Sequence, residues 1–213
     1  MTLKVSLLSM FLAMAIGLPL AFLRMSKHFV PREAAVVYIE VSRGMPILVI
    51  IFWVYWGFPE IANQLLPLLG IKGVLVSKYM TGFVSGVIAL TLKYAGYLAE
   101  IFRAGIEAIK MGQTEAAYSL GFSKVQTMRR IVLPQAFRVI IPPTGNAFVG
   151  ALQDSALVSI IGVNDLMRQA QLAVADLYRP FEVFTAVAVL YLAMTITTSK
   201  INDYIERKKM VIE

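Results

Sequence analysis

Long apolar runs alternate with short charged stretches along the whole chain. A helix needs about 20 consecutive apolar residues to cross a bilayer, and several of these runs reach that length. The expected membrane helices cover residues 3–23, 33–58, 79–109, 134–152 and 181–201. The pattern therefore predicts an all-α membrane protein with five transmembrane helices.

The composition supports this fold class and narrows the possible chemistry. Hydrophobic residues make up 58% of the 213 residues, 15% are charged, and the mean hydropathy is +0.72, whereas a soluble domain carries about 25% charged residues. The chain has no cysteine and one histidine, His28, which leaves no basis for a disulfide framework or a site of several thiolates or imidazoles. We expect no metal and no cofactor in this chain, and His28 is either an interfacial residue or a pH-sensitive group.

The distribution of basic residues predicts the orientation. A net charge of +7 could suggest nucleic acid, but the basic residues gather in short loops between apolar runs, so we expect no nucleic-acid partner. Arg24, Lys27 and Arg32 follow the first span, and residues 200–213 form a basic tail. By the positive-inside rule the N-terminus lies outside and the C-terminus inside.

Two segments between spans should then lie on the outer side of the membrane. Residues 59–78 contain Pro67 and are too short for a further span, so they suggest a re-entrant or surface helix. Residues 158–179 carry charged and amide side chains, including Asp165 and Arg168, which predict an exposed segment.

Residues 115–134 form the only long polar segment between very apolar ones. Helix formers over residues 113–120 predict a short helix, and Gly121 should end it because glycine accepts the left-handed conformation. Ser123 and Gln126 can form a capping box for a second helix, and the proline at the end suits the first turn of a following span. The segment predicts a helix–turn–helix elbow, although such elbows can also be simple interfacial connectors.

The elbow carries a residue pattern that points to a family. The pattern comprises Glu115, Ala116, Ala117, Gly121, Ile131, Leu133 and Pro134. At this spacing it resembles the EAA loop of membrane subunits of bacterial ABC importers. The chain is also similar to the polar-amino-acid (histidine, arginine, glutamine) branch, through Tyr38-Ile39-Glu40, Arg43-Gly44-Met45-Pro46 and the run from Tyr97 to Arg103. The resemblance spans nearly the whole chain and implies a single type I ABC importer transmembrane domain over residues 1–213, with its EAA loop at residues 115–134.

This resemblance implies several partners. The elbow would be a coupling helix that docks on a separate ATPase subunit. Its contact residues would be Glu115, Ala116, Ala117, Leu120 and Gly121. ATP and Mg²⁺ would bind that subunit, since this chain has no P-loop. A second permease subunit, identical or related, would pair with this one in the lipid bilayer of the bacterial cytoplasmic (inner) membrane. Residues 158–179 would contact an extracellular or periplasmic amino-acid-binding protein, or are an ordinary surface loop.

Charged residues inside the expected spans are candidates for a substrate path. Glu40 and Arg43 are three residues apart. They form either an internal ion pair that fixes helix packing, or a site in which Glu40 helps to line the substrate path. Gly44 and Pro46 interrupt their helix, and broken membrane helices usually line cavities. Lys93 lies mid-span and needs a partner, for which Glu40 and Asp154 are the candidates. Near the end of the same helix, acidic and basic side chains at helical spacing suggest a solvated ladder.

A second polar cluster follows the proline pair Pro142-Pro143, which should kink the span. Its members are Asn146, Gln153, Asp154 and Ser155. Asp154 could bind an ammonium group, and Asn146 and Ser155 could donate to a carboxylate, which suits a zwitterionic ligand. Alternatively, Asp154 only begins the external loop. Relatives often have lysine where Gln153 stands, which favours a cationic amino acid.

Together these patterns predict a permease subunit of an ATP-driven importer that moves polar, possibly basic, amino acids. The sequence lacks a P-loop and the GxSxG and HExxH motifs, so we expect no enzymatic activity in this chain. A passive channel or secondary transporter would explain the polar mid-span residues but not the EAA pattern. A membrane scaffold would explain the elbow but would not need Glu40 or Asp154.

Overall fold

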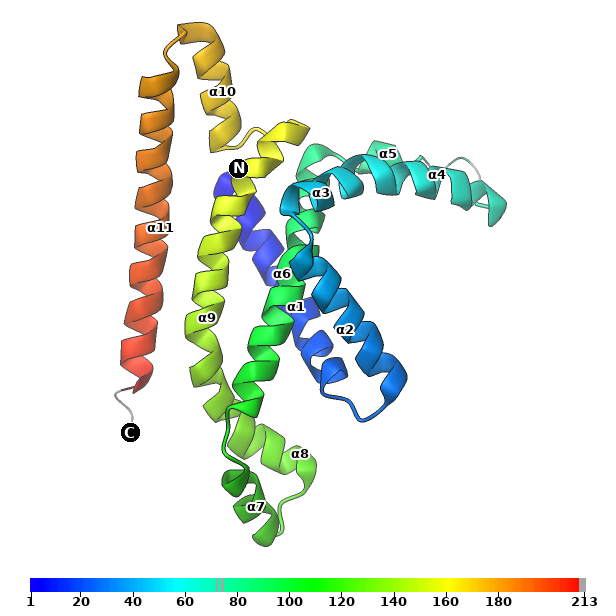
Figure 1. Cartoon of the computed structure of the whole chain (residues 1–213), viewed down its shortest axis with the longest axis vertical. Helices are drawn as coiled ribbons and strands as arrows, with labels where there is room; N and C mark the ends of the chain where they lie inside the picture. The colour runs from blue at the N-terminus through cyan, green and yellow to red at the C-terminus, as the bar shows by residue number, and fades with distance from the viewer. Residues whose placement is uncertain (72, 74, 211–213) are drawn as a thin grey trace.

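The computed structural model describes residues 1–71, 73 and 75–210, and regular structure within them is entirely helical (Figure 1). The elements are α1 (Thr2–Arg24), α2 (Phe29–Gly44), α3 (Ile47–Phe52), the π-helical turn η1 (Trp53–Gly57), α4 (Phe58–Leu68), α5 (Val76–Tyr79), α6 (Gly82–Glu107), α7 (Met111–Ser119), α8 (Lys124–Thr127), the π-helical turn η2 (Met128–Val132), α9 (Leu133–Asp154), the 3-10 helix η3 (Ser155–Ile161), α10 (Leu166–Leu177) and α11 (Pro180–Met210). Within this part of the chain, 4 helices are long and apolar enough to cross a membrane, or up to 5 if one bent pair is counted as a span. The predicted all-α membrane fold is confirmed.

Helix α6 runs through the middle of the molecule, with α9 and α2 on either side of it (Figure 1). The elbow helices α7 and α8 lie at one end, and α10 lies at the other. Helix α11 descends beside α9 toward the elbow end. It continues to Met210, further than the predicted residues 181–201, and the last three residues of the predicted tail, 211–213, lie outside the described residues.

Small residues allow the close packing of α6 against its neighbours. A Cβ on Gly17 of α1 would lie 3.0 Å from the Cβ of Leu98. Ser9 donates to the carbonyl of Val87 at 3.2 Å, and Thr91 donates back to the carbonyl of Ser9 at 3.4 Å. Because lipid is as apolar as the side chains, such close contacts and interhelical hydrogen bonds hold membrane helices together.

The predicted helix over residues 33–58 is broken where expected. Helix α2 ends at Gly44, Met45 is extended with φ −82° and ψ 138°, and α3 begins at Ile47. Proline disfavours the helical conformation of the residue before it, so Pro46 explains this break. Beyond it, the apolar helix continues to Leu68, and the candidate span is Ile47–Leu68. The first part of the predicted external segment is therefore one continuous helix with α3.

Two prolines are accommodated by π-helical turns. The turn η1 ends two residues before Pro59, and η2 ends two residues before Pro134. A proline ring crowds the carbonyl four residues earlier, and the wider π turn relieves that contact. In contrast, α9 continues as a helix through Pro142 and Pro143, so the expected kink does not interrupt it.

Candidate functional site

One face of α6 carries polar side chains in the middle of this largely apolar helix. Lys93, Tyr97 and Glu100 are four and three residues apart, which places them along one face. All three are partly exposed, whereas Leu98 and Ala99 between them are fully buried. We call these three residues the α6 polar stripe. Charged groups facing lipid are costly, so protein or water must cover this face in the membrane.

The end of the stripe farther from the elbow contains an ion pair between α6 and α9. Lys93 Nζ lies 3.5 Å from Asp154 Oδ2, and the Tyr94 hydroxyl donates to the same oxygen at 3.0 Å. The Lys93 side chain is 14% exposed and that of Asp154 27%. Gly150, one turn before Asp154, permits this approach, because a Cβ there would lie 3.0 Å from the Tyr94 hydroxyl oxygen. Of the two candidate partners for Lys93, the structure selects Asp154 over Glu40.

The end of the stripe nearer the elbow joins α6 to α1. Glu100 Oε2 lies 3.2 Å from Nε of Arg24 at the end of α1. Glu100 also pairs with Arg103, which in turn pairs with Glu107. The Arg24 and Glu100 side chains are 22% and 20% exposed, and Arg24 Nη1 is buried without a hydrogen-bond partner. The predicted solvated ladder is therefore a partly buried network that ties two helices together near the elbow.

Helix α2 contributes the other predicted path residues. The Arg43 guanidinium lies 5.5 Å from the centre of the Tyr97 ring, a cation–π distance. Glu40 is exposed, and no ion pair between Glu40 and Arg43 forms within the described part of the chain. The structure therefore brings Arg43 to the α6 polar stripe, whereas Glu40 is exposed on α2.

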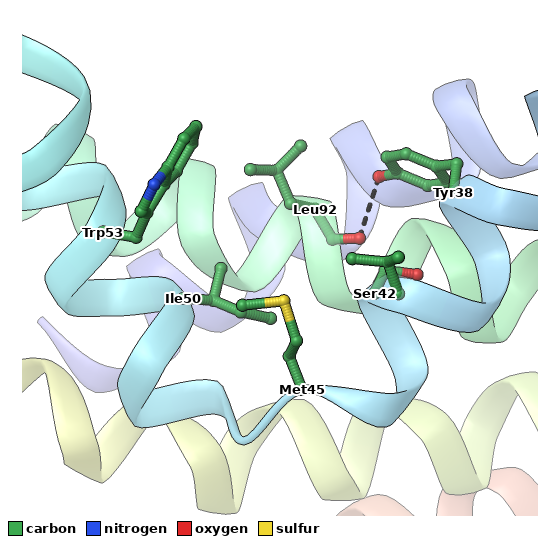
Figure 2. Close-up of a pocket in the computed structure, with 7 residues that line it drawn as sticks. Tyr38, Ser42, Met45, Ile50, Trp53 and Leu92 are labelled. Atoms are coloured by element: carbon green, nitrogen blue, oxygen red, sulfur yellow. Dashed lines mark hydrogen bonds between the residues drawn. The ribbon is translucent and has the colours of Figure 1, made fainter. Parts of the chain in front are cut away.

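The break between α2 and α3 borders a separate apolar cavity of about 320 Å³ (Figure 2). It is lined by Tyr38, Val41, Ser42, Met45, Ile50, Trp53 and Leu92. The Tyr38 hydroxyl donates to the Leu92 carbonyl at 2.8 Å, so its polar atom is already engaged. Such a lining suits an apolar group, and the polar ligand expected from the sequence has better partners on the α6 polar stripe.

The predicted cluster on α9 is divided between different faces of the helix. Asp154 faces α6, and Asn146 is exposed two turns before it. Gln153 instead lines a cavity of about 470 Å³ between α9, α10 and α11. Ser155 is fully buried and donates to the Leu152 carbonyl at 2.7 Å. Only Asp154 of the four is in contact with the stripe.

The elbow has the predicted geometry. Helix α7 ends at Ser119, and Gly121 has φ +82°. The Gly121 N–H donates to the Tyr118 carbonyl, and the Phe122 N–H donates to the Ala117 carbonyl. These two hydrogen bonds form a Schellman motif. Ser123 then opens α8 through a complete capping box. Both local signals identified in the sequence are confirmed.

The predicted docking residues do not all face outward. Glu115, Ala116, Leu120 and Gly121 are exposed, Leu120 at 79%. Ala117 is only 3% exposed and therefore supports the elbow from within. Ala116 and Leu120, together with Ala117, line a groove of about 480 Å³ between α7 and η2.

The second half of the elbow is continuous with a membrane span. Helix α8, η2 and α9 follow one another without a break, as one helical body from Lys124 to Ile161. The Gln135 side chain donates to the Gln113 side chain at 3.1 Å and so links this rod to α7. A force on the elbow is therefore applied directly to the helix that carries Asp154.

Asp165 contradicts the sequence expectation of an exposed segment. It is 1% exposed, and its Oδ1 caps α10 by accepting the Arg168 N–H at 2.9 Å. Burial raises the pKa of this carboxyl group above the ordinary aspartate value. Burial of Asp165 depends on its packing against other elements, which the local sequence does not show.

Sequence reasoning also missed Tyr94 and Arg24. Tyr94 directly follows the mid-span lysine, but successive helical residues point about 100° apart, so only the packing of α9 shows that both side chains reach the same carboxylate. Arg24 served only as an orientation signal, and nothing local indicates that it reaches Glu100 across 76 residues of sequence.

Comparisons with known proteins agree with this arrangement. Residues 13–211 match the family model "Binding-protein-dependent transport system inner membrane component". The chain is 39% identical to the probable amino-acid permease protein YxeN of Bacillus subtilis, over 97% of this chain and 87% of that protein. It is 34% identical to the glutamine transport system permease protein GlnP of Escherichia coli K12, over 100% and 91% of the two chains. Among solved structures, an amino acid ABC transporter with histidines is similar at a TM-score of 0.83 and 39% identity, covering 98% of this chain and 90% of that chain.

Proposed function

The chain belongs to the family of inner membrane components of binding-protein-dependent transport systems and is the permease of an ATP-driven amino-acid importer, not its ATPase; we propose that the α6 polar stripe lines its substrate path and that the elbow couples it to ATP hydrolysis. Such an importer implies an ATPase subunit, which binds ATP and Mg²⁺, and a solute-binding protein.

The main support for the substrate path is a set of charged side chains within the membrane that the chain does not fully bury. Lys93 and Asp154 are partly exposed, and Arg43 is exposed. Helix α6, which carries Lys93, packs against both α9 and α2, which carry the other two. Facing lipid would be costly for these groups, which favours a second permease subunit on this face, identical or related, with a hydrated path between the two. Glu40 and Asn146 are exposed at the margins and would contact substrate, whereas Gln153 and Ser155 would act through the packing of α9.

Coupling follows from the rigidity of the elbow. The exposed side chains of Glu115, Ala116 and Leu120 would occupy a groove of the ATPase, and the absence of a side chain at Gly121 would allow close approach. Closure of two ATPase subunits would then move the elbow, and the continuous rod from α8 to α9 would transmit that movement to Asp154. Ala117 would hold α7 against the base of this rod.

The same arrangement fits the predicted orientation. With the elbow on the cytoplasmic side, the N-terminus would lie outside and α11 would return to the inside, in the bacterial cytoplasmic membrane. Helix α10 and its flanking loops would then face the binding protein.

A transport assay with a matched pair of variants tests the coupling role. The chain is reconstituted in proteoliposomes with the ATPase and binding protein of its transport system, and ATP-dependent uptake of labelled amino acids is measured. Gly121→Asp places a charged side chain on the docking surface and should abolish uptake. Gly70→Asp is the control, because Gly70 also has φ +82° with no atom within 4 Å of an added Cβ, but lies far from the elbow in sequence.

Three outcomes distinguish the possible functions. Loss of uptake in Gly121→Asp alone supports the coupling role. Equal uptake by both variants would show that the elbow does not dock as proposed. Uptake that persists without ATP would favour a passive channel or secondary transporter.

A further inference from the structure

We propose that Lys93 determines the charge of the transported substrate: by neutralising Asp154, it makes the path select amino acids with an uncharged side chain and reject cationic ones. This inference rests on the proposed function, because it assumes that the α6 polar stripe lines the substrate path. The sequence predicted polar, possibly basic, amino acids, and this inference narrows that class to those with an uncharged side chain.

The first argument concerns Gln153, the residue that suggested a cationic substrate. Its side chain lines the cavity between α9, α10 and α11, together with Tyr191 and Thr195. Asp154 points instead to α6. An uncharged residue at position 153 therefore leaves the charge of the path unchanged.

The second argument is the balance of charge around Asp154. One carboxylate can offset one cation, and Lys93 already supplies that cation at 3.5 Å. Arg43 faces Tyr97, and Glu100 is engaged by two arginines of its own. Including exposed Glu40, the path has two acidic and two basic groups and no net charge, so it has no excess negative charge to attract a guanidinium or ammonium side chain on the substrate.

The third argument is that Asp154 retains a free position for a zwitterion. Lys93 and Tyr94 both approach Oδ2, and within the described residues no side chain donates a hydrogen bond to Oδ1. With 27% of the side chain exposed, Oδ1 can accept the α-ammonium group of an amino acid. The ammonium group of Lys93 can then attract the substrate's α-carboxylate, so that all four charges are paired.

The test is ligand binding to the permease–ATPase complex in lipid nanodiscs, without the binding protein. Labelled glutamine is displaced by unlabelled glutamine, arginine or glutamate. The wild-type complex should bind glutamine in preference to arginine. Lys93→Met should raise the affinity for arginine relative to glutamine at least tenfold, and Lys93→Arg should retain the wild-type preference. Lys78→Met, on the exposed helix α5, is the matched control and should change nothing.

A reciprocal variant separates specificity from a purely structural ion pair. Asp154→Asn leaves the Lys93 charge unbalanced and should shift preference toward glutamate. A structural pair would lower the affinity for all three ligands equally in both variants, and that result would overturn the proposal. So would a wild-type preference for arginine, or an unchanged ratio in Lys93→Met. If the wild-type system takes up none of these amino acids in an ATP-dependent manner in the proteoliposome assay described above, the proposed function itself is wrong, and the inference falls with it.

Discussion

The packing of α2 against α6 depends on the absence of a side chain at Gly96. A Cβ at this position would lie 1.9 Å from Ser42 Oγ and 3.2 Å from Ser42 Cβ. The Ser42 hydroxyl is buried and donates to the Ile39 carbonyl at 3.1 Å, so it cannot rotate away without losing that bond. Gly96→Ala should therefore force α2 away from α6. The disturbed contact lies next to Arg43 and the apolar cavity of Figure 2.

The expected cost follows from two opposing effects. Overpacking costs about 1–3 kcal/mol, and the better helix propensity of alanine offsets up to about 1 kcal/mol of it. We expect Gly96→Ala to lower the free energy of unfolding by about 1–2 kcal/mol. Ser42→Ala alone should cost about 1 kcal/mol through the lost hydrogen bond. In the double variant the two costs should be less than additive by about 1 kcal/mol, because the hydroxyl group that makes the shortest contact is gone.

The assay is unfolding of the purified chain in mixed micelles at increasing SDS, for the wild type, both single variants and the double variant. Gly112→Ala in α7 is the control, because nothing lies within 4 Å of an added Cβ there, and it should leave stability unchanged or slightly increased. The reasoning fails if Gly96→Ala is as harmless as Gly112→Ala, or if Ser42→Ala does not reduce its cost.

Two further predictions concern charged groups and use the same unfolding assay. Glu100→Gln should lower the free energy of unfolding by about 1–2 kcal/mol, a value discounted for the partial exposure of the side chain. The loss arises because the Arg24 and Arg103 guanidinium groups lose their shared carboxylate. Glu107→Gln, at a side chain that is 49% exposed, should change the free energy of unfolding by less than about 0.5 kcal/mol. Equal effects of the two variants would show that burial of the network is unimportant. Asp165→Asn should stabilise the protein at neutral pH, because burial raises the pKa of this carboxyl group and the amide oxygen can still cap α10. A raised pKa means that the folded state binds a proton more readily than the unfolded state. Wild-type stability should therefore rise as the pH falls through that raised pKa toward the ordinary aspartate value. In that pH range the stability advantage of the variant should disappear. Destabilisation by Asp165→Asn at neutral pH would contradict this account.

The sequence alone determined the features that depend on a few neighbouring residues. Apolar run length predicted that the chain folds into membrane helices, since hydrogen bonding within the helix is obligatory in lipid, but it placed the second span at residues 33–58 and not at Ile47–Leu68. Gly121 and the Ser123 capping box predicted how the elbow turns, because both act within one helical turn of the backbone. The cost of an unpaired mid-span charge restricted the partners of Lys93 to two residues.

Only the tertiary structure decided which face each helix turns toward its neighbours. Gln153 and Asp154 are adjacent in the chain, yet they face different helices, because successive helical residues point about 100° apart and packing sets the rotation of α9. Packing likewise buried Asp165 and Ala117, and it brought Arg24 to Glu100. Hydropathy and spacing contain no information on that rotation, which is settled by contacts between residues that are distant in sequence.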